Sequence, residues 1–177
     1  MSGVRVLGVA GWSGCGKTTL LTRLIPLLVG RGLKVATIKH AHHSFDVDQP
    51  GKDSWAHRSA GASEVLVSSA RRWVQMHELG AETEATLAQL LERVSPCDLV
   101  LVEGFKRQRH PKLEVFRKAL GASPLFPQDD RVVAVASDQA FPEARIPVVD
   151  LDDIPAIADL VCARAEALPQ VLAALAR

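Results

Sequence analysis

Residues 11 to 18 read GWSGCGKT and match the phosphate-binding pattern G-x-x-x-x-G-K-[ST], known as Walker A, at every fixed position. The match lies between an apolar run typical of a strand and a run with helical spacing of leucines. Its glycines let the backbone wrap an anion, and the N-terminus of the following helix adds positive potential. The motif predicts that Lys17 reaches the terminal phosphates of a nucleotide and that the Thr18 hydroxyl binds Mg²⁺. The predicted phosphate-binding set is Gly11, Ser13, Gly14, Cys15, Gly16, Lys17, Thr18 and Thr19.

Cys15 lies inside this loop, directly before the last glycine and the lysine of the motif. The helix N-terminus beside Cys15 favours a lowered thiol pKa, although nothing in the sequence requires a redox role. The alternative interpretation of the motif is a glycine-rich turn that contains a chance lysine.

A second acid for Mg²⁺ is expected at Glu103, where the apolar run DLVLV ends in EGFK. A buried strand of this kind delivers a carboxylate beside the phosphate loop, and that carboxylate can hold Mg²⁺ directly or through water. Asp98 begins the same run and therefore lies at the wrong end of the strand. The alternative for Glu103 is a surface acid at a strand end.

The segment IKHAHHSFDVDQPGKDS, residues 38 to 54, concentrates histidines, acids and lysines after a predicted strand. It starts at the carboxyl edge of the sheet, where ligands bind, so its first residues are expected near the nucleotide phosphates. Asp46 or Asp48 is expected to reach Mg²⁺ or an attacking water, and the free amides of the helix that opens after Gly51 suit a second anion. The alternative is a polar loop with one good helix cap. The predicted switch-like, anion-facing set is Lys39, His40, His43, Asp46, Lys52 and Asp53.

Recognition of a guanine base has a weaker signal. The chain contains no asparagine, so the common guanine signature N-K-x-D is absent. The run VVAVASDQ ends a predicted strand with Ser137 and Asp138, and a carboxylate there can accept hydrogen bonds from the N1 and N2 groups of guanine. The alternative for Asp138 is an aspartate that caps a turn or a helix.

A basic loop, FKRQRHPK, follows the acidic strand end. Its first two cations, Lys106 and Arg107, are predicted to form a positive rim that attracts an anionic ligand or an acidic partner. The alternative is a solvated basic loop, except that Lys106 directly follows EGF and is expected near the nucleotide. We find no glutamine placed to orient a water and no evident arginine finger, so hydrolysis is expected to be slow, although Arg107 or Arg109 could act across a dimer. The catalytic residues are therefore unknown.

The hydrophobic pattern alternates strands with helices over the whole chain, which predicts an α/β fold with a mostly parallel sheet covered by helices on both faces. Residues 63 to 79 interrupt the alternation and are predicted to form a β-hairpin extension that contributes to a homodimer interface. The stretch from 121 to 130, with two prolines and two aspartates, is expected to be the least ordered. The predicted organisation is a single phosphate-loop domain over residues 1–177.

Composition excludes several other classes. The formal net charge of +1 gives no reason to expect a nucleic acid partner, and the longest apolar runs are interrupted by charge or proline, which argues against a membrane span. The N-terminus lacks the features of a signal peptide. Three widely spaced cysteines are typical of free thiols in a reducing cytoplasm, where we expect the protein.

The segments GWSGCGKTTL, IKHAHHSFDVDQPGKDSWAHRSAGA and LVLVEGFK occur in this order and at intervals that resemble the molybdopterin-guanine dinucleotide biosynthesis protein B (MobB) family. The first segment is shared by many phosphate-loop proteins, whereas the second and third together are much more specific. The resemblance covers nearly the whole chain, through VAVASD and the C-terminal helix.

The resemblance implies a homodimeric phosphate-loop NTPase fold that binds GTP with Mg²⁺ and hydrolyses it slowly at most. It also implies an adapter role beside a MobA-type guanylyltransferase, the partner that attaches GMP to molybdopterin, with molybdopterin itself a possible ligand. The alternative is a metal-handling chaperone GTPase of the same phosphate-loop class, which the histidines of residues 38–54 suggest. His40, His42 and His43 lie too close together on an extended chain to converge easily on one metal, and no cysteine is near them in the sequence.

Overall fold

The computed structural model describes residues 3–41 and 45–177, and its contacts divide the chain into two compact units. The first, here called the main unit, comprises the chain up to His40 together with Leu87–Arg177. The second, the hairpin unit, comprises Ala41–Thr86. The expectation of a single domain over 1–177 stays a prediction.

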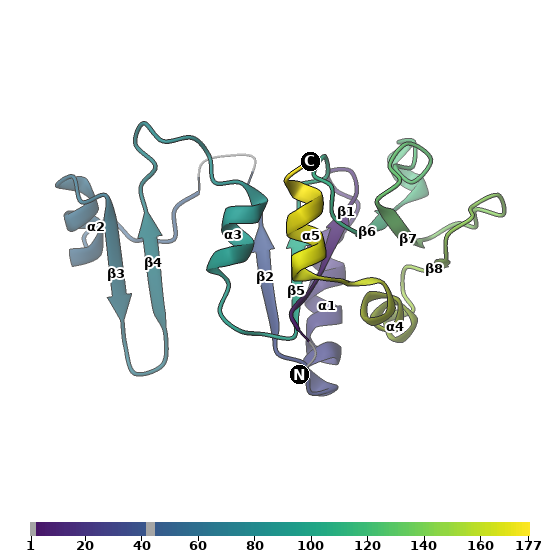
Figure 1. The fold of residues 1–177 in the computed structure, drawn as a ribbon, viewed down its shortest axis with the longest axis horizontal. Coiled ribbons are helices and arrows are strands. Elements are labelled where there is room, and N and C mark those ends of the chain that lie inside the picture. The colour runs from purple at the N-terminus through teal and green to yellow at the C-terminus, as the bar shows by residue number, and fades with distance from the viewer. Residues whose placement is uncertain (1–2, 42–44) are drawn as a thin grey trace. The chain divides into compact units, whose positions relative to one another are not determined.

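The described part of the main unit is built on a seven-stranded sheet with the order β2-β5-β1-β6-β7-β8, in which all neighbouring strands are parallel (Figure 1). A short strand, β9, pairs with the first half of β1 in the antiparallel sense. Because the strands are parallel, their carboxyl ends meet at one edge of the sheet, where ligands bind in open α/β folds. The strands are β1 Arg5–Ala10, β2 Val35–Lys39, β5 Leu99–Glu103, β6 Lys112–Phe116, β7 Val132–Ser137, β8 Val148–Asp150 and β9 Glu166–Ala167.

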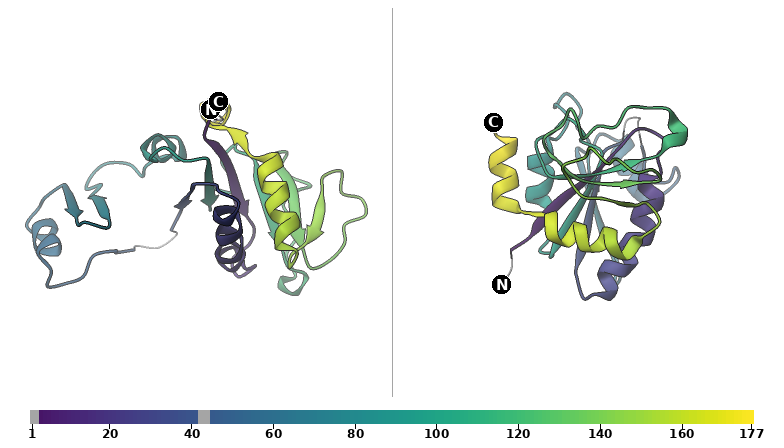
Figure 2. Two further views of the ribbon diagram at one scale, coloured as in Figure 1. Left: turned by 90° about the horizontal axis from the view of Figure 1, so that it is seen from below. Right: turned by 90° about the vertical axis from the view of Figure 1, so that its right-hand side faces the viewer.

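Helices cover both faces of this sheet, as Figures 1 and 2 show. On one face, Leu7 and Val9 of β1 belong to a buried cluster with the apolar sides of α1 and α4. On the other face, Val6 belongs to a second cluster with α3 and α5. The alternation along β1 follows from the two-residue period of a strand. These helices are α1 Lys17–Gly30, α3 Leu87–Arg93, α4 Ile154–Arg164 and α5 Leu168–Leu175. The predicted parallel sheet with helices on both faces is confirmed.

A third apolar cluster fixes the segments that follow β6 and β7. Phe141 makes edge-on contacts with Phe116 and Phe126, with ring centroids 5.0 and 5.2 Å apart. The buried carboxylate of Glu114 accepts hydrogen bonds from the backbone N–H groups of Leu125 and Phe126, at 2.7 and 2.9 Å. Residues 121–130, expected to be the least ordered stretch, are therefore held by a carboxylate and an aromatic cluster.

The hairpin unit consists of one short helix and one β-hairpin. The helix α2, Asp53–Ser59, precedes the antiparallel strands β3, Glu64–Ser68, and β4, Trp73–His77. Val65 and Met76 face each other across the two strands and are buried. The predicted hairpin within residues 63–79 is confirmed, and its role in a dimer stays a prediction. In the described part of the chain, no helix has the length and apolar character needed to cross a membrane.

His110 is a buried histidine beside the central strand of the main unit. It is 0% exposed, and neither of its ring nitrogens has a hydrogen-bond partner among the described residues. The ring packs against Gly8, where an added Cβ would lie 2.3 Å from Nε2, so only glycine fits there. Burial, followed by the charge of Lys112, lowers the pKa of His110 from 6.5 to about 4. The histidine is therefore neutral in the folded protein at neutral pH.

This burial makes the folded state sensitive to mild acid. Between pH 6.5 and about 4 the unfolded chain binds a proton at His110 that the folded chain does not bind, so the free energy of unfolding falls as the pH falls through this window. The expected loss is about 3 kcal/mol, measured as the difference between urea unfolding curves at pH 7 and pH 4. A His110→Gln variant is expected to show a smaller dependence on pH over the same range. Equal dependence in both proteins would show that another group is responsible.

Candidate functional site

The loop between β1 and α1 has the backbone conformation that its glycines allow. Gly11, Gly14 and Gly16 have φ values of 143°, 80° and 95°, a region that residues with a Cβ rarely adopt. At Gly11 an added Cβ would also lie 2.5 Å from the carbonyl oxygen of Val115. Gly16 is the N-cap of α1, so the helix starts at Lys17 with its free N–H groups at the loop. The sequence-predicted phosphate-binding set thus lies in one strand–loop–helix turn.

Lys17 lies against the loop itself. Its ammonium group donates to the carbonyl oxygens of Gly11 and Trp12, at 3.0 and 2.9 Å, and lies 3.8 Å from the sulfur of Cys15. The Cys15 thiol is buried, and this burial raises its pKa more than the nearby lysine lowers it. The expectation of a lowered thiol pKa is therefore wrong, because desolvation of the thiolate outweighs the positive charge beside it.

The two predicted magnesium ligands lie side by side. The Thr18 hydroxyl donates a hydrogen bond to Oε1 of Glu103 at 3.0 Å, and Lys39 Nζ lies 4.0 Å from the other carboxylate oxygen. Parallel pairing of β5 with β1 places Glu103 opposite Val9, at the end of the strand that leads into the phosphate loop. A hydroxyl and a carboxylate are the hard oxygen ligands that Mg²⁺ prefers. Among the described residues, no cluster of three or more histidine, cysteine or acidic side chains is arranged to hold a metal by itself.

The residues after Glu103 make a strained turn beside the same loop. Gly104 has φ 97°, and Phe105 has φ 50°, the one positive value outside glycine in the described chain. The Phe105 ring packs on His40 with centroids 4.7 Å apart, and the ammonium group of Lys106 lies 4.5 Å from the centre of the Trp12 ring. Lys106 of the predicted rim therefore contacts the phosphate loop. Of the next two cations, Arg107 is exposed and Arg109 pairs with Asp130 at 3.4 Å.

The predicted switch-like set is divided between the two units. Lys39 and His40 end β2 in the main unit, and the backbone N–H of His40 donates to the Glu103 carbonyl at 2.9 Å. Asp46, Lys52 and Asp53 belong to the hairpin unit, and Lys52 is the extended residue that precedes α2, without a side-chain cap. His43 and the neighbouring His42 lie outside the described residues.

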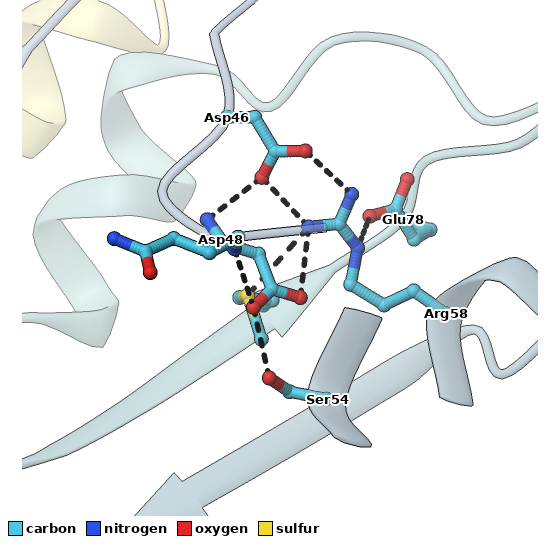
Figure 3. A network of polar contacts seen from close by, with 7 residues as sticks. Asp46, Asp48, Ser54, Arg58 and Glu78 are labelled. Carbon is cyan, nitrogen blue, oxygen red and sulfur yellow. Dashed lines mark hydrogen bonds and ion pairs between the residues drawn. The ribbon is translucent and has the colours of Figure 1, made fainter. Parts of the chain in front are cut away.

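Within the hairpin unit, Arg58 of α2 gathers the acids of the preceding segment, as Figure 3 shows. Its guanidinium makes two hydrogen bonds to Asp46, at 2.7 and 3.0 Å, and ion pairs with Asp48 at 3.4 Å and Glu78 at 2.9 Å. The hydrogen bond from Arg58 lowers the pKa of Asp46 to about 2. Asp48 also accepts a hydrogen bond from the Ser54 hydroxyl at 2.8 Å. Both acids that were expected to reach Mg²⁺ or water are thus engaged by an arginine that the sequence analysis did not single out.

The residues predicted for guanine recognition end β7, at the carboxyl edge of the sheet. Ser137 is buried, and its hydroxyl accepts a hydrogen bond from the Gln139 N–H at 3.0 Å. The Asp138 carboxylate accepts a hydrogen bond from the backbone N–H of Lys118 at 2.8 Å. Both side chains thus organise turns at this edge, and their contact with a base stays a prediction.

Sequence reasoning missed Arg117, which follows β6. Its Nε donates to the carbonyl oxygen of Cys15 in the phosphate loop at 3.1 Å. The two residues are 102 positions apart in the chain, so no local motif connects them. Its position after β6 could have indicated it. A residue directly after a parallel strand that neighbours β1 lies at the same edge of the sheet as the phosphate loop.

A phosphate-loop turn at the carboxyl edge of a parallel sheet, with a lysine in the loop and a threonine–glutamate pair beside it, defines a phosphate-loop NTPase-like α/β protein. The family model for molybdopterin guanine dinucleotide synthesis protein B (MobB) matches residues 6–138. The chain belongs to this family, and the resemblance drawn from the sequence is confirmed.

Individual relatives agree with this assignment. A molybdopterin-guanine dinucleotide biosynthesis adapter protein of Escherichia coli is 45% identical over 161 residues, which is 89% of this chain and 91% of the relative. The protein of the same name from Haemophilus influenzae is 42% identical over 159 residues, 89% of this chain and 88% of the relative. A crystal structure of molybdopterin-guanine biosynthesis protein B matches 89% of this chain and 98% of its own with a TM-score of 0.68 and 28% identity.

Proposed function

We propose that this protein binds GTP together with Mg²⁺ and acts as an adapter in molybdopterin guanine dinucleotide synthesis, with slow GTP hydrolysis at most. The observation that carries the nucleotide part is the hydrogen bond from Thr18 to Glu103, which brings two oxygen ligands together beside the phosphate loop. The adapter part is supported by the names of the relatives that are 45% and 42% identical.

The proposed roles of the residues follow from their positions. The N–H groups of the glycine loop and of the first turn of α1 hold the phosphates, and Lys17 turns from the loop carbonyls to the terminal phosphates. Thr18 and Glu103 would hold Mg²⁺, which would neutralise phosphate charge when bound. Lys39 lies beside Glu103 and supplies a further cation at the same edge. Because Glu103 is assigned to Mg²⁺ in this proposal, it is not available to activate an attacking water, which fits slow hydrolysis.

Ser137 and Asp138 are proposed to recognise guanine from the end of β7, and Lys106 and Arg107 to form the positive rim. Of the switch-like set, Lys39 and His40 at the end of β2 are proposed to face a second anion, either a phosphate of GTP or that of molybdopterin. We place the protein in the cytoplasm.

The nucleotide proposal is tested by titrating the purified protein with GTP and with ATP, each with and without Mg²⁺, by calorimetry. We expect tighter binding of GTP than of ATP, and weaker binding when Mg²⁺ is removed. The Lys17→Ala variant is expected to lose at least tenfold in GTP affinity, because one charge-assisted hydrogen bond is worth about 1.5–3 kcal/mol. Glu103→Gln is expected to reduce the benefit of Mg²⁺ while it leaves Mg²⁺-free binding nearly unchanged. A preference for ATP, or a Lys17→Ala variant that binds GTP like the parent, would refute the nucleotide proposal.

We also propose that the hairpin unit associates with a second copy of the chain. Leu66 and Trp73 of the hairpin are 64% and 63% exposed, and strand pairing places them on the same face, since Leu66 pairs with Gln75 and Ser68 with Trp73. Near the turn, Val67 and Val74 face each other on the opposite side and are also exposed. A two-stranded ribbon with apolar residues on both faces is marginally stable by itself, and a second hairpin offers the same apolar surface in return.

The dimer proposal is tested by analytical ultracentrifugation of the double variant Trp73→Asp, Met76→Asp. We expect the parent to sediment as a dimer and the variant as a monomer, because Trp73→Asp would place an unpaired charge in the proposed interface and Met76→Asp would place one in the interior of the hairpin unit. Since Met76 is buried within its own unit, the single variant Trp73→Asp, which leaves the interior of that unit unchanged, is expected to be a folded monomer. A variant that keeps the parent's sedimentation coefficient would contradict the proposal.

The adapter role requires a partner, and the proposed partner is a MobA-type molybdenum cofactor guanylyltransferase. We expect affinity-tagged protein to retain the purified guanylyltransferase on a column, and the metal-chaperone alternative to show no such retention. Retention that survives in 1 M salt would indicate an apolar contact, because surface ion pairs are strongly screened there. Failure of retention with and without GTP and molybdopterin would contradict the proposed partner.

A further inference from the structure

The segment Arg117–Ser123, here called the outer brace, follows β6, makes two hydrogen bonds to the phosphate loop and places Leu120 beside Gly14. Arg117 Nε donates to the Cys15 carbonyl at 3.1 Å. The Trp12 indole N–H donates to the Ser123 carbonyl at 2.8 Å. Between these contacts, a Cβ placed on Gly14 would lie 3.8 Å from a methyl group of Leu120, an ordinary packing distance. The phosphate loop, which follows β1, is thus supported by the segment that follows the neighbouring strand β6.

The outer brace is itself fixed to the sheet on both sides. The backbone N–H of Lys118 is held by the Asp138 carboxylate at the end of β7. Just beyond the brace, Leu125 and Phe126 are held by the buried carboxylate of Glu114, which lies in β6. The first anchor joins the brace itself to the end of β7, and the second joins the segment just beyond the brace to β6, so the brace is held close to both of its ends.

The contact made by Arg117 sets the direction of a peptide group. In a planar trans peptide the carbonyl and the following N–H point in opposite directions. The guanidinium holds the Cys15 carbonyl, so the N–H of Gly16, in the same peptide unit, is directed away from Arg117. The guanidinium also packs on Gly16, where an added Cβ would lie 3.4 Å from Nε and 3.6 Å from Nη2. Gly16 has φ 95° and is the N-cap of α1, so the Cys15–Gly16 peptide lies where the loop ends and the helix begins.

We infer that Arg117 is a positioning residue for the nucleotide phosphates. It fixes the Cys15–Gly16 peptide so that the Gly16 N–H faces the phosphates, and it adds positive charge at the loop without being part of the motif. This inference rests on the proposed nucleotide binding and deepens it, because it assigns to residues outside the motif the task of holding the loop in shape. Preorganised donors bind an anion without a reorganisation cost at the moment of binding, which is the effect that Arg117 supplies.

The first test measures GTP and GDP affinity by calorimetry for the parent, Arg117→Ala and Arg117→Gln. We expect both variants to bind both nucleotides about tenfold or more weakly, the loss of one charge-assisted hydrogen bond. Arg164→Ala is the matched control, because it removes the same charge from an exposed arginine in the last turn of α4. Its nucleotide affinities are expected to equal those of the parent. Arg117 variants that bind GTP within twofold of the parent, while Lys17→Ala loses binding, would overturn the inference and leave the proposed function standing.

The second test does not depend on nucleotide. Amide hydrogen exchange of the nucleotide-free proteins is followed in peptides that cover residues 11–20 and, as an internal reference, residues 99–103. We expect Arg117→Ala and Arg117→Gln to speed exchange in the first peptide and not in the second, whereas a merely structural role would speed both. Unchanged exchange in residues 11–20 would overturn the inference. If the parent protein binds no GTP, the proposed function fails, and this exchange measurement still decides whether Arg117 holds the loop. Should Arg117→Ala fold poorly, Arg117→Gln, which retains part of the aliphatic stem and a polar amide end, gives the same comparison.

Discussion

The close approach of Gly11 to the carbonyl oxygen of Val115 is the constraint on which the rest of the site depends. A side chain at Gly11 would collide with that oxygen, so the chain can leave β1 and turn toward α1 only through a glycine. The same approach follows from the pairing of β1 with β6, which places Ala10 opposite Glu114. The pairing of the strands therefore determines the shape of the loop and the point where α1 starts. On the other side of β1, pairing with β5 brings Glu103 within hydrogen-bond distance of Thr18.

Electrostatics reinforces this geometry. The formal net charge of the whole chain is only +1, yet in the described main unit Lys17, Lys39, Lys106 and Arg117 all contact the phosphate loop or Glu103. Positive charge concentrated at the phosphate loop raises the local concentration of anions and favours their binding. The chain thus needs no overall excess of cations, because the topology gathers a few of them at one edge of the sheet.

The parts of the site that could be predicted from the sequence are local or repeat a general rule of parallel sheets. The phosphate loop is a contiguous motif, and Glu103 follows from the rule that functional side chains stand at the carboxyl ends of buried strands. Arg117 could not be found in this way, because its partner Cys15 is far away in the sequence and meets it only when β6 lies beside β1. Asp46 was expected to reach Mg²⁺ or water because it is an acid in a polar segment. The sequence does not show that Arg58 is its partner, since the two residues meet only once α2 has folded. The Cys15 thiol shows a third limit, since its burial and raised pKa depend on packing that the motif does not encode.

The pairing of β1 has a consequence for the order in which the protein acquires its structure. The strand β1 is made first, but its three partners β5, β6 and β9 begin at Leu99, Lys112 and Glu166. The first half of β1 is therefore complete in the sheet only after the last part of the chain has been synthesised. Contacts over such separations slow folding and leave hydrophobic strands exposed for longer. A nascent chain would thus carry its phosphate-loop sequence well before it had the sheet that gives the loop its shape.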